Sequence, residues 1–209
     1  MKPREIEDRS FEIISNTIKG LEYDDNSINI LKRVIHTTAD FDYVENLTIS
    51  EDAVSTFKKL VQNDVTIVTD TKMSLAGINK GAISKTKVKL VTFISNEQVA
   101  KNAKKNQTTR SKEAVKFALE NIETPIIFVV GNAPTALMEI CELIDRNEYK
   151  DGLVIAVPVG FVNVIESKEM IMKKSIPYIV SKGRKGGSNV AAAIINALLY
   201  DYVGRENEK

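Results

Sequence analysis

Hydrophobic and polar positions along this chain switch between the 3.6-residue period of helices and short β-branched runs typical of buried strands. Five runs have strand character, at residues 65–69, 89–93, 125–130, 152–157 and 177–180. Helical periods separate and follow them, at residues 96–105, 110–122, 134–148, 164–174 and 188–202. Strands that alternate with helices predict parallel pairing through right-handed crossovers.

The first third of the chain is predicted to be helical. Three helices are expected there, over residues 3–20, from Ser27 as the capping residue to about His36, and over residues 51–63 after Ser50. The whole pattern predicts a single α/β domain over residues 1–209. We expect a Rossmann-like, three-layer α/β/α architecture with a mainly parallel sheet of about five strands and a helical N-terminal segment.

Composition limits the class of protein. A hydrophobic content of 43% with 27% charged residues is ordinary for a globular domain. No apolar run approaches the ~20 residues that a membrane span needs, and the first residues lack the pattern of a signal peptide. The single cysteine, Cys141, excludes an internal disulfide and a cysteine-based zinc site, and helical spacing predicts that it is buried. We therefore expect a cytoplasmic protein with no metal site and no membrane association.

Charge is unevenly distributed although the net charge is only +1. Residues 1–70 carry eight basic against fourteen acidic side chains, whereas residues 79–116 carry ten basic against two acidic ones. A local basic field suits an anionic ligand, although a solvated lysine-rich surface would give the same composition. Nucleic acid is not an expected partner, because the basic segment lacks interleaved aromatic residues and any known reader motif.

The predicted strand ends are unusually rich in glycine, proline and hydroxyl residues. Ligands of parallel sheets bind at the carboxyl ends of the strands, so these corners are the places to look for chemistry. Residues 183–188, Gly-Arg-Lys-Gly-Gly-Ser, follow the last strand and open the last helix. Glycines allow close approach of the backbone, and a helix N-terminus supplies free N–H groups, so this loop predicts an anion site. Asn132, at a second strand-to-helix corner, is predicted to cap its helix. Local chemistry alone allows a nucleotide, a sugar phosphate or a carboxylated macrocycle.

One histidine is present in the whole chain, His36. Histidine is the side chain whose unperturbed pKa lies nearest to neutral pH, so His36 is the natural candidate for a proton donor. Thr37, Thr38 and Asp40 are candidates for the residue that orients it, and the last requires the helix to continue past the threonines.

Five sequence motifs occur in an order that is specific to one family. They are residues 35–40 (Ile-His-Thr-Thr-Ala-Asp), Thr69-Asp70 with Met73 and 76–78, residues 131–137, residues 158–162 with 166–168, and residues 183–188. With these motifs the chain resembles the precorrin-8X methylmutase family, also called cobalt-precorrin-8 methylmutases or precorrin isomerases, from about Pro3 to Leu199.

The resemblance implies an isomerase of cobalamin biosynthesis that acts on a tetrapyrrole without a cofactor. A methyl group would move from carbon 11 to carbon 12 of precorrin-8 or its cobalt form, giving hydrogenobyrinate or cobyrinate. By the same resemblance, His36 is the general acid, and the residues that bind the carboxylate-rich substrate are Ser10, Thr37, Arg110, Asn132, Lys185, Gly186, Gly187 and Ser188. It also implies a homodimer whose site the partner subunit helps to complete. Ser10 could equally face solvent in mid-helix, and Tyr43 could stack on the macrocycle or belong to the core.

Two other functions are compatible with parts of the pattern. A corrinoid-binding carrier would use the same anion sites but would need no proton donor. A Rossmann-type nucleotide enzyme would need a Gly-x-Gly-x-x-Gly loop and an acidic residue about 20 residues further on, and the sequence has neither.

Overall fold

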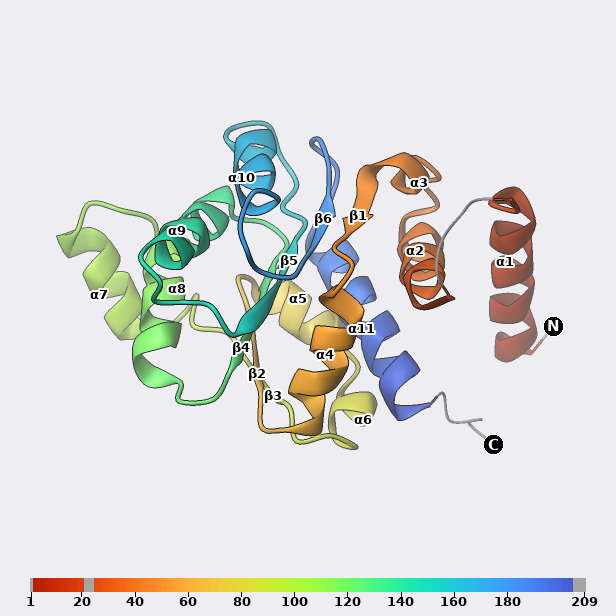
Figure 1. Cartoon of the computed structure of the whole chain (residues 1–209), viewed down its shortest axis with the longest axis horizontal. Coiled ribbons are helices and arrows are strands. Elements are labelled where there is room, and N and C mark those ends of the chain that lie inside the picture. Colours follow the sequence, from red (N-terminus) through yellow and green to blue (C-terminus); the bar gives the residue numbers. More distant parts are fainter. Residues whose placement is uncertain (1, 21–24, 205–209) are drawn as a thin grey trace.

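The computed structural model describes residues 2–20 and 25–204 of the 209-residue chain (Figure 1). Within these residues the strands are β1 (Leu47–Ile49), β2 (Thr66–Thr69), β3 (Lys89–Val91), β4 (Ile126–Val130), β5 (Gly152–Ala156) and β6 (Tyr178–Ser181). The helices are α1 (Pro3–Thr17), α2 (Asp25–Thr38), α3 (Tyr43–Asn46), α4 (Ala53–Gln62), α5 (Lys72–Gly77), α6 (Lys80–Ile83), α7 (Glu97–Lys105), α8 (Arg110–Asn121), α9 (Pro134–Asp145), α10 (Val164–Ile171) and α11 (Ser188–Val203).

The strands form one sheet in the order β1-β6-β5-β4-β2-β3. Strands β2 to β6 are parallel, as the alternation of strands and helices predicted. The prediction of about five strands missed β1, which pairs antiparallel with β6 at the edge and places a strand in the expected all-helical third. Three residues are too short a run to show a period of two, so the sequence pattern carries no signal for this strand.

Alternate residues of each central strand enter different hydrophobic clusters, because successive side chains of a strand point to opposite faces. On β4, Ile127 and Val129 join a cluster with α2, α4 and α11, whereas Phe128 and Val130 join a second cluster with α8, α9 and α10. Helices therefore cover both faces of the sheet, and all five residues of β4 are buried.

The helix boundaries agree with the predicted ranges to within a few residues, with two local corrections. Helix α2 begins at Asp25, so Ser27 lies inside its first turn and is not the capping residue. Helix α4 begins at Ala53, and Ser50 instead donates to the Asp52 carboxylate (2.9 Å) and accepts from the Tyr178 amide. The short helices α3, α5 and α6 lie in segments to which no element was assigned.

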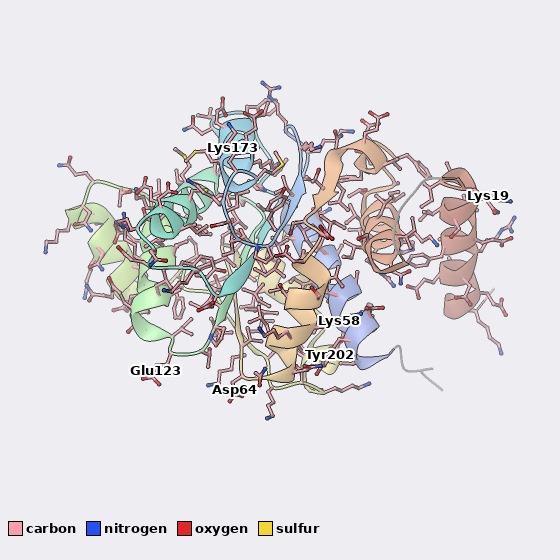
Figure 2. All side chains as sticks on the ribbon, in the orientation of Figure 1. Lys19, Lys58, Asp64, Glu123, Lys173 and Tyr202 are labelled. Atoms are coloured by element: carbon pink, nitrogen blue, oxygen red, sulfur yellow. The ribbon has the colours of Figure 1, made fainter. Side chains whose placement is uncertain are left out.

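The order in which strands are added to the sheet reverses between the parallel strands β2 and β4. After β2 the chain passes through α5 and α6 to the edge strand β3, whereas after β4 it proceeds through α9 to β5 on the other side. Asp64 and Glu123, which precede β2 and β4, lie at the lower rim in Figure 2, so that rim is the amino edge of the sheet. The opposite, carboxyl edge at this reversal is where parallel sheets bind ligands.

The carboxyl ends of β4 and β6 approach each other closely through a glycine. A Cβ on Gly131 would lie 2.8 Å from Cα and 3.0 Å from N of Ser188, the first residue of α11. Neither atom can move without shifting the backbone of that helix. A glycine at position 131 is therefore required by the packing of two corners.

Substituting Gly131 by Ala should lower the free energy of unfolding by about 1–3 kcal/mol, the usual cost of forcing an extra methyl into a packed site. Chemical denaturation measures this change. Asn132→Ala, one residue along the same corner, removes exposed atoms and should stay within about 0.5 kcal/mol of the wild type. Equal stability of the two variants would contradict the close approach.

Candidate active site

The corner after β4 is held by a buried carboxylate from the neighbouring strand. Asp70, directly after β2, accepts hydrogen bonds from the backbone amides of Gly131 (2.9 Å), Asn132 (2.8 Å) and Ala133 (2.8 Å). Burial raises the pKa of Asp70 above its ordinary value, and the three amides oppose that shift. Ala133 is the residue that caps α9, so the predicted capping role of Asn132 is wrong, and the Asn132 side chain is exposed.

A second contact joins the ends of β2 and β6. The hydroxyls of Thr71 and Ser188 lie 2.8 Å apart, and Thr71 also caps α5 by accepting from the Ser74 amide. Gly187 donates its amide to the Val157 carbonyl (2.9 Å), and Gly160 donates to the Arg184 carbonyl (3.2 Å). The glycine-rich loop is therefore fastened to the ends of β2 and β5.

Two glycines of this loop occupy backbone conformations that other residues avoid. Gly186 has a φ of 154° and Gly187 a φ of 134°. A Cβ on Gly186 would lie 2.2 Å from the Val157 carbonyl oxygen. Both residues, predicted to bind substrate, are thus needed to close the loop against the end of β5.

The exposed lysine of the loop makes contacts that the sequence did not suggest. Lys185 donates from Nζ to the carboxylates of Asp40 (2.7 Å) and Asp42. This pairing and the Asp42 amide hold the pKa of the Asp40 carboxyl below its ordinary value, and the two carboxylates raise the pKa of Lys185. The ion pairs tie the glycine-rich loop to the segment that follows His36.

His36 lies in the last turn of α2, and its imidazole is partly exposed. The ring stacks on Phe11 of α1, with centroids 5.0 Å apart and planes at 11°. The Arg33 guanidinium lies 4.7 Å from the centroid of the same Phe11 ring and pairs with Glu7 of α1 at 2.9 Å. Helix α1, which stands at one end of the molecule in Figure 1, therefore docks on α2 beside the histidine.

Thr37, Thr38 and Asp40 are the candidates for the residue that orients His36. Helix α2 ends at Thr38, and Ala39 has a left-handed φ of 54°, so the helix does not continue to Asp40. The Thr38 hydroxyl donates to the Val34 carbonyl (2.8 Å), and the Asp40 carboxylate accepts from Lys185 and from the Asp42 amide. Thr37 is exposed.

The other predicted site residues lie in two places: Ser10 on α1, and Arg110 at the corner after β4. Ser10 lies next to Phe11 on α1, near His36, and its hydroxyl donates to the Ile6 carbonyl (2.8 Å). Arg110 is the first residue of α8 and is exposed. Thr109, which precedes it, lies 2.9 Å by hydroxyl from Thr135 of α9, so Arg110 belongs to the corner after β4. Helices α8 and α2, which carry Arg110 and His36, cover opposite faces of the sheet.

Sequence reasoning placed residues 158–162 and Met73 in family motifs but assigned no binding role to the apolar side chains there. Phe161 and Val162, in the loop after β5, are 84% and 77% exposed, and Val159 and Met73 are also exposed. A group of exposed apolar residues marks a binding surface more often than single apolar residues scattered over a surface do. The sequence signal was the Phe161-Val162 pair itself, because it directly follows Gly160 in a loop, where large apolar side chains are not expected to pack into a core.

The remaining predictions concern two buried side chains, metal ligands and membrane spans. Tyr43 is buried in the core, which decides between its two interpretations, and burial raises its pKa to about 12. Cys141 is a free, fully buried thiol, as predicted. Over residues 2–20 and 25–204, no group of three His, Cys, Asp or Glu side chains is arranged to hold a metal ion. No helix among the described residues is long and apolar enough to cross a membrane.

The sequence and the structure of this chain are similar to those of one protein family. A sequence model of the precorrin-8X methylmutase family matches residues 5–201. A cobalt-precorrin-8 methylmutase of Salmonella typhimurium is 43% identical over 204 residues, which is 95% of each chain. One of Leptospira interrogans is 41% identical over 94% of this chain and 92% of its own. A crystal structure of precorrin-8X methylmutase from Thermus thermophilus superposes with a TM-score of 0.83 at 32% identity, over 93% of this chain and 95% of the other.

Substituting Asp40 by Asn should affect stability only where the carboxylate is ionised. Because the folded pKa of Asp40 lies below its ordinary value of 3.8, the stabilisation is present above that pH and is lost as pH falls through the folded pKa. The melting temperature of Asp40→Asn should therefore lie slightly below that of the wild type at neutral pH, and the gap should close well below pH 3.8. Asp64→Asn, the same change at the amino edge, serves as the control (Figure 2). A gap that persists unchanged in acid would contradict the ion pair.

Proposed function

This chain belongs to the precorrin-8X methylmutase family, and we propose that it moves a methyl group from carbon 11 to carbon 12 of precorrin-8 with His36 as the proton donor. It is an enzyme of cobalamin biosynthesis, an intramolecular transferase like the relatives that are named methylmutases. The proposed product is hydrogenobyrinate, or cobyrinate where the substrate already holds cobalt. The migrating methyl stays within one molecule, so the reaction needs no external methyl donor and no redox cofactor.

The observation that carries this proposal is the position of His36. It is the only histidine in the chain, its ring is partly exposed, and Asp40 and Lys185 link its segment to the glycine-rich loop. Protonation of the macrocycle near ring C would draw electron density from the conjugated system and ease migration to the adjacent carbon. General acid catalysis of this kind contributes about 10²–10⁴-fold to a rate.

The composition of the edge suits a corrinoid. The substrate has broad apolar faces and a rim of acetate and propionate carboxylates. Exposed Phe161 and Val162 offer apolar contact, while Arg184 and the amides of the glycine-rich loop offer donors to carboxylates. This combination favours a carboxylated macrocycle over a nucleotide.

A second copy of the chain completes the proposed site. Arg110 and His36 lie on helices that cover opposite faces of the sheet, yet both are assigned to one substrate. Pairing two chains edge to edge would bring Arg110 of one subunit to the substrate held beside His36 of the other. We therefore propose a homodimer with shared sites.

Replacing His36 by Ala should greatly slow turnover and leave binding of the substrate intact. Purified wild type and His36→Ala are incubated anaerobically with precorrin-8 and its cobalt form while the visible spectrum is recorded. The wild type should change the spectrum to that of a product of unchanged mass, and the variant should be slower by about 10²-fold or more. Binding of both substrates by the wild type without conversion would instead indicate a corrinoid carrier.

Mixing two inactive variants tests the shared site. His36→Ala and Arg110→Ala homodimers should each be impaired, and subunit exchange between them should restore activity, because half of the sites in a mixed dimer keep both residues. Light scattering measures the oligomeric state in parallel. A monomeric active enzyme, or no recovery after proven exchange, would contradict the shared site.

A further inference from the structure

The side chain of Lys168 lies beneath the glycine-rich loop, on α10. It is 1% exposed, although lysine is among the residues that are rarely buried without a charged partner. Its Nζ donates to the carbonyl oxygens of Gly183 (2.9 Å) and Lys185 (2.8 Å) and to the Ser181 hydroxyl (3.3 Å). Burial lowers the pKa of Lys168 to about 8.

These contacts fix the direction of two backbone amides. The peptide bonds of the described chain are all trans, so the N–H of each residue points opposite to the carbonyl before it. The carbonyls of Gly183 and Lys185 point toward the ammonium. The amides of Arg184 and Gly186 therefore point away from it, and neither donates to any protein group in the part of the chain that the structure describes.

The charge of Lys168 also lacks a counter-ion. All three acceptors of its ammonium are neutral, and no carboxylate of residues 2–20 or 25–204 forms an ion pair with it. The neighbouring lysine of the loop differs, since Lys185 contacts two aspartates. A buried cation without a counter-ion favours an anion on the other side of the loop.

We propose that Lys168 is a positioning residue that turns residues 183–187 into a site for one substrate carboxylate. By holding two carbonyls inward, it aims the Arg184 and Gly186 amides at the ligand, and the carboxylate balances its charge. This inference rests on the proposed function, because the carboxylate is that of the corrinoid. The role of Lys168 differs from the substrate binding that the sequence predicted for Lys185, because its ammonium contacts the loop and not the ligand.

The first test uses the wild type alone. The probe is hydrogenobyrinate, which is metal-free and suits NMR. Amide hydrogen exchange at Arg184 and Gly186 should be fast in the free protein, because neither amide has a protein acceptor, and should slow at least tenfold in the complex. Unchanged exchange at both amides in a saturated complex would overturn the proposal.

The second test removes the ammonium with little change in volume. Lys168→Met should raise the Kd for hydrogenobyrinate at least tenfold and raise KM more than it lowers kcat, since no proton transfer is affected. Lys173→Met makes the same charge change on the exposed end of the α10 segment and should leave Kd unchanged (Figure 2). A folded Lys168→Met protein with the wild-type Kd would overturn the proposal, and if that variant does not fold, the exchange measurement decides.

Failure of the two hypotheses can be told apart. A wild type that neither binds hydrogenobyrinate nor converts precorrin-8 overturns the proposed function, and the carboxylate site falls with it. A wild type that does both, while the two amides and Lys168→Met behave as if the lysine were irrelevant, overturns the inference alone.

Discussion

The carboxylate of Asp70 lies at the carboxyl end of β2, where the order of strands in the sheet reverses. It accepts hydrogen bonds from three successive amides of the corner after β4. Without this acceptor, the amides of Gly131 and Ala133, just before α9, would be buried without partners, which costs about 1–3 kcal/mol for each group. The bonds fix the corner against which the first residue of α11 packs, through Gly131. The position of the glycine-rich loop at the start of α11 thus depends on a carboxylate at the end of β2, which lies three places from β6 in the sheet order.

Two lysines then give the loop its shape from opposite sides. Lys168 holds its carbonyls from within, and Lys185 binds Asp40 and Asp42 at the surface, next to the segment that carries His36. Both sets of contacts lie within the protein itself. A loop that its own contacts order loses little conformational entropy when a ligand binds, and preorganised donors suit a reaction that depends on orientation.

The parallel strands could be predicted from continuous β-branched and apolar runs, as in residues 126–130, and the long helices from patterns that extend over many residues, as in residues 188–203. Strand β1 and helix α3 could not, since three or four residues define no period and tertiary pairing alone selects their conformation. The corners at Gly131 and Gly186 were found from residue type. The partners of Asp70, Lys168 and Lys185 were missed, because they lie 13 or more residues away in sequence and only the fold brings them together.

The central claim is that a corrinoid lies at the carboxyl edge with its reacting ring against His36, and a crystal structure with bound hydrogenobyrinate tests it most directly. We expect an imidazole nitrogen of His36 within hydrogen-bond reach of ring C, about 3 Å from the atom that takes the proton. We also expect a substrate carboxylate on the amides of residues 183–187. A corrinoid bound elsewhere, or with ring C facing away from the only histidine of the chain, would contradict the proposed role of His36.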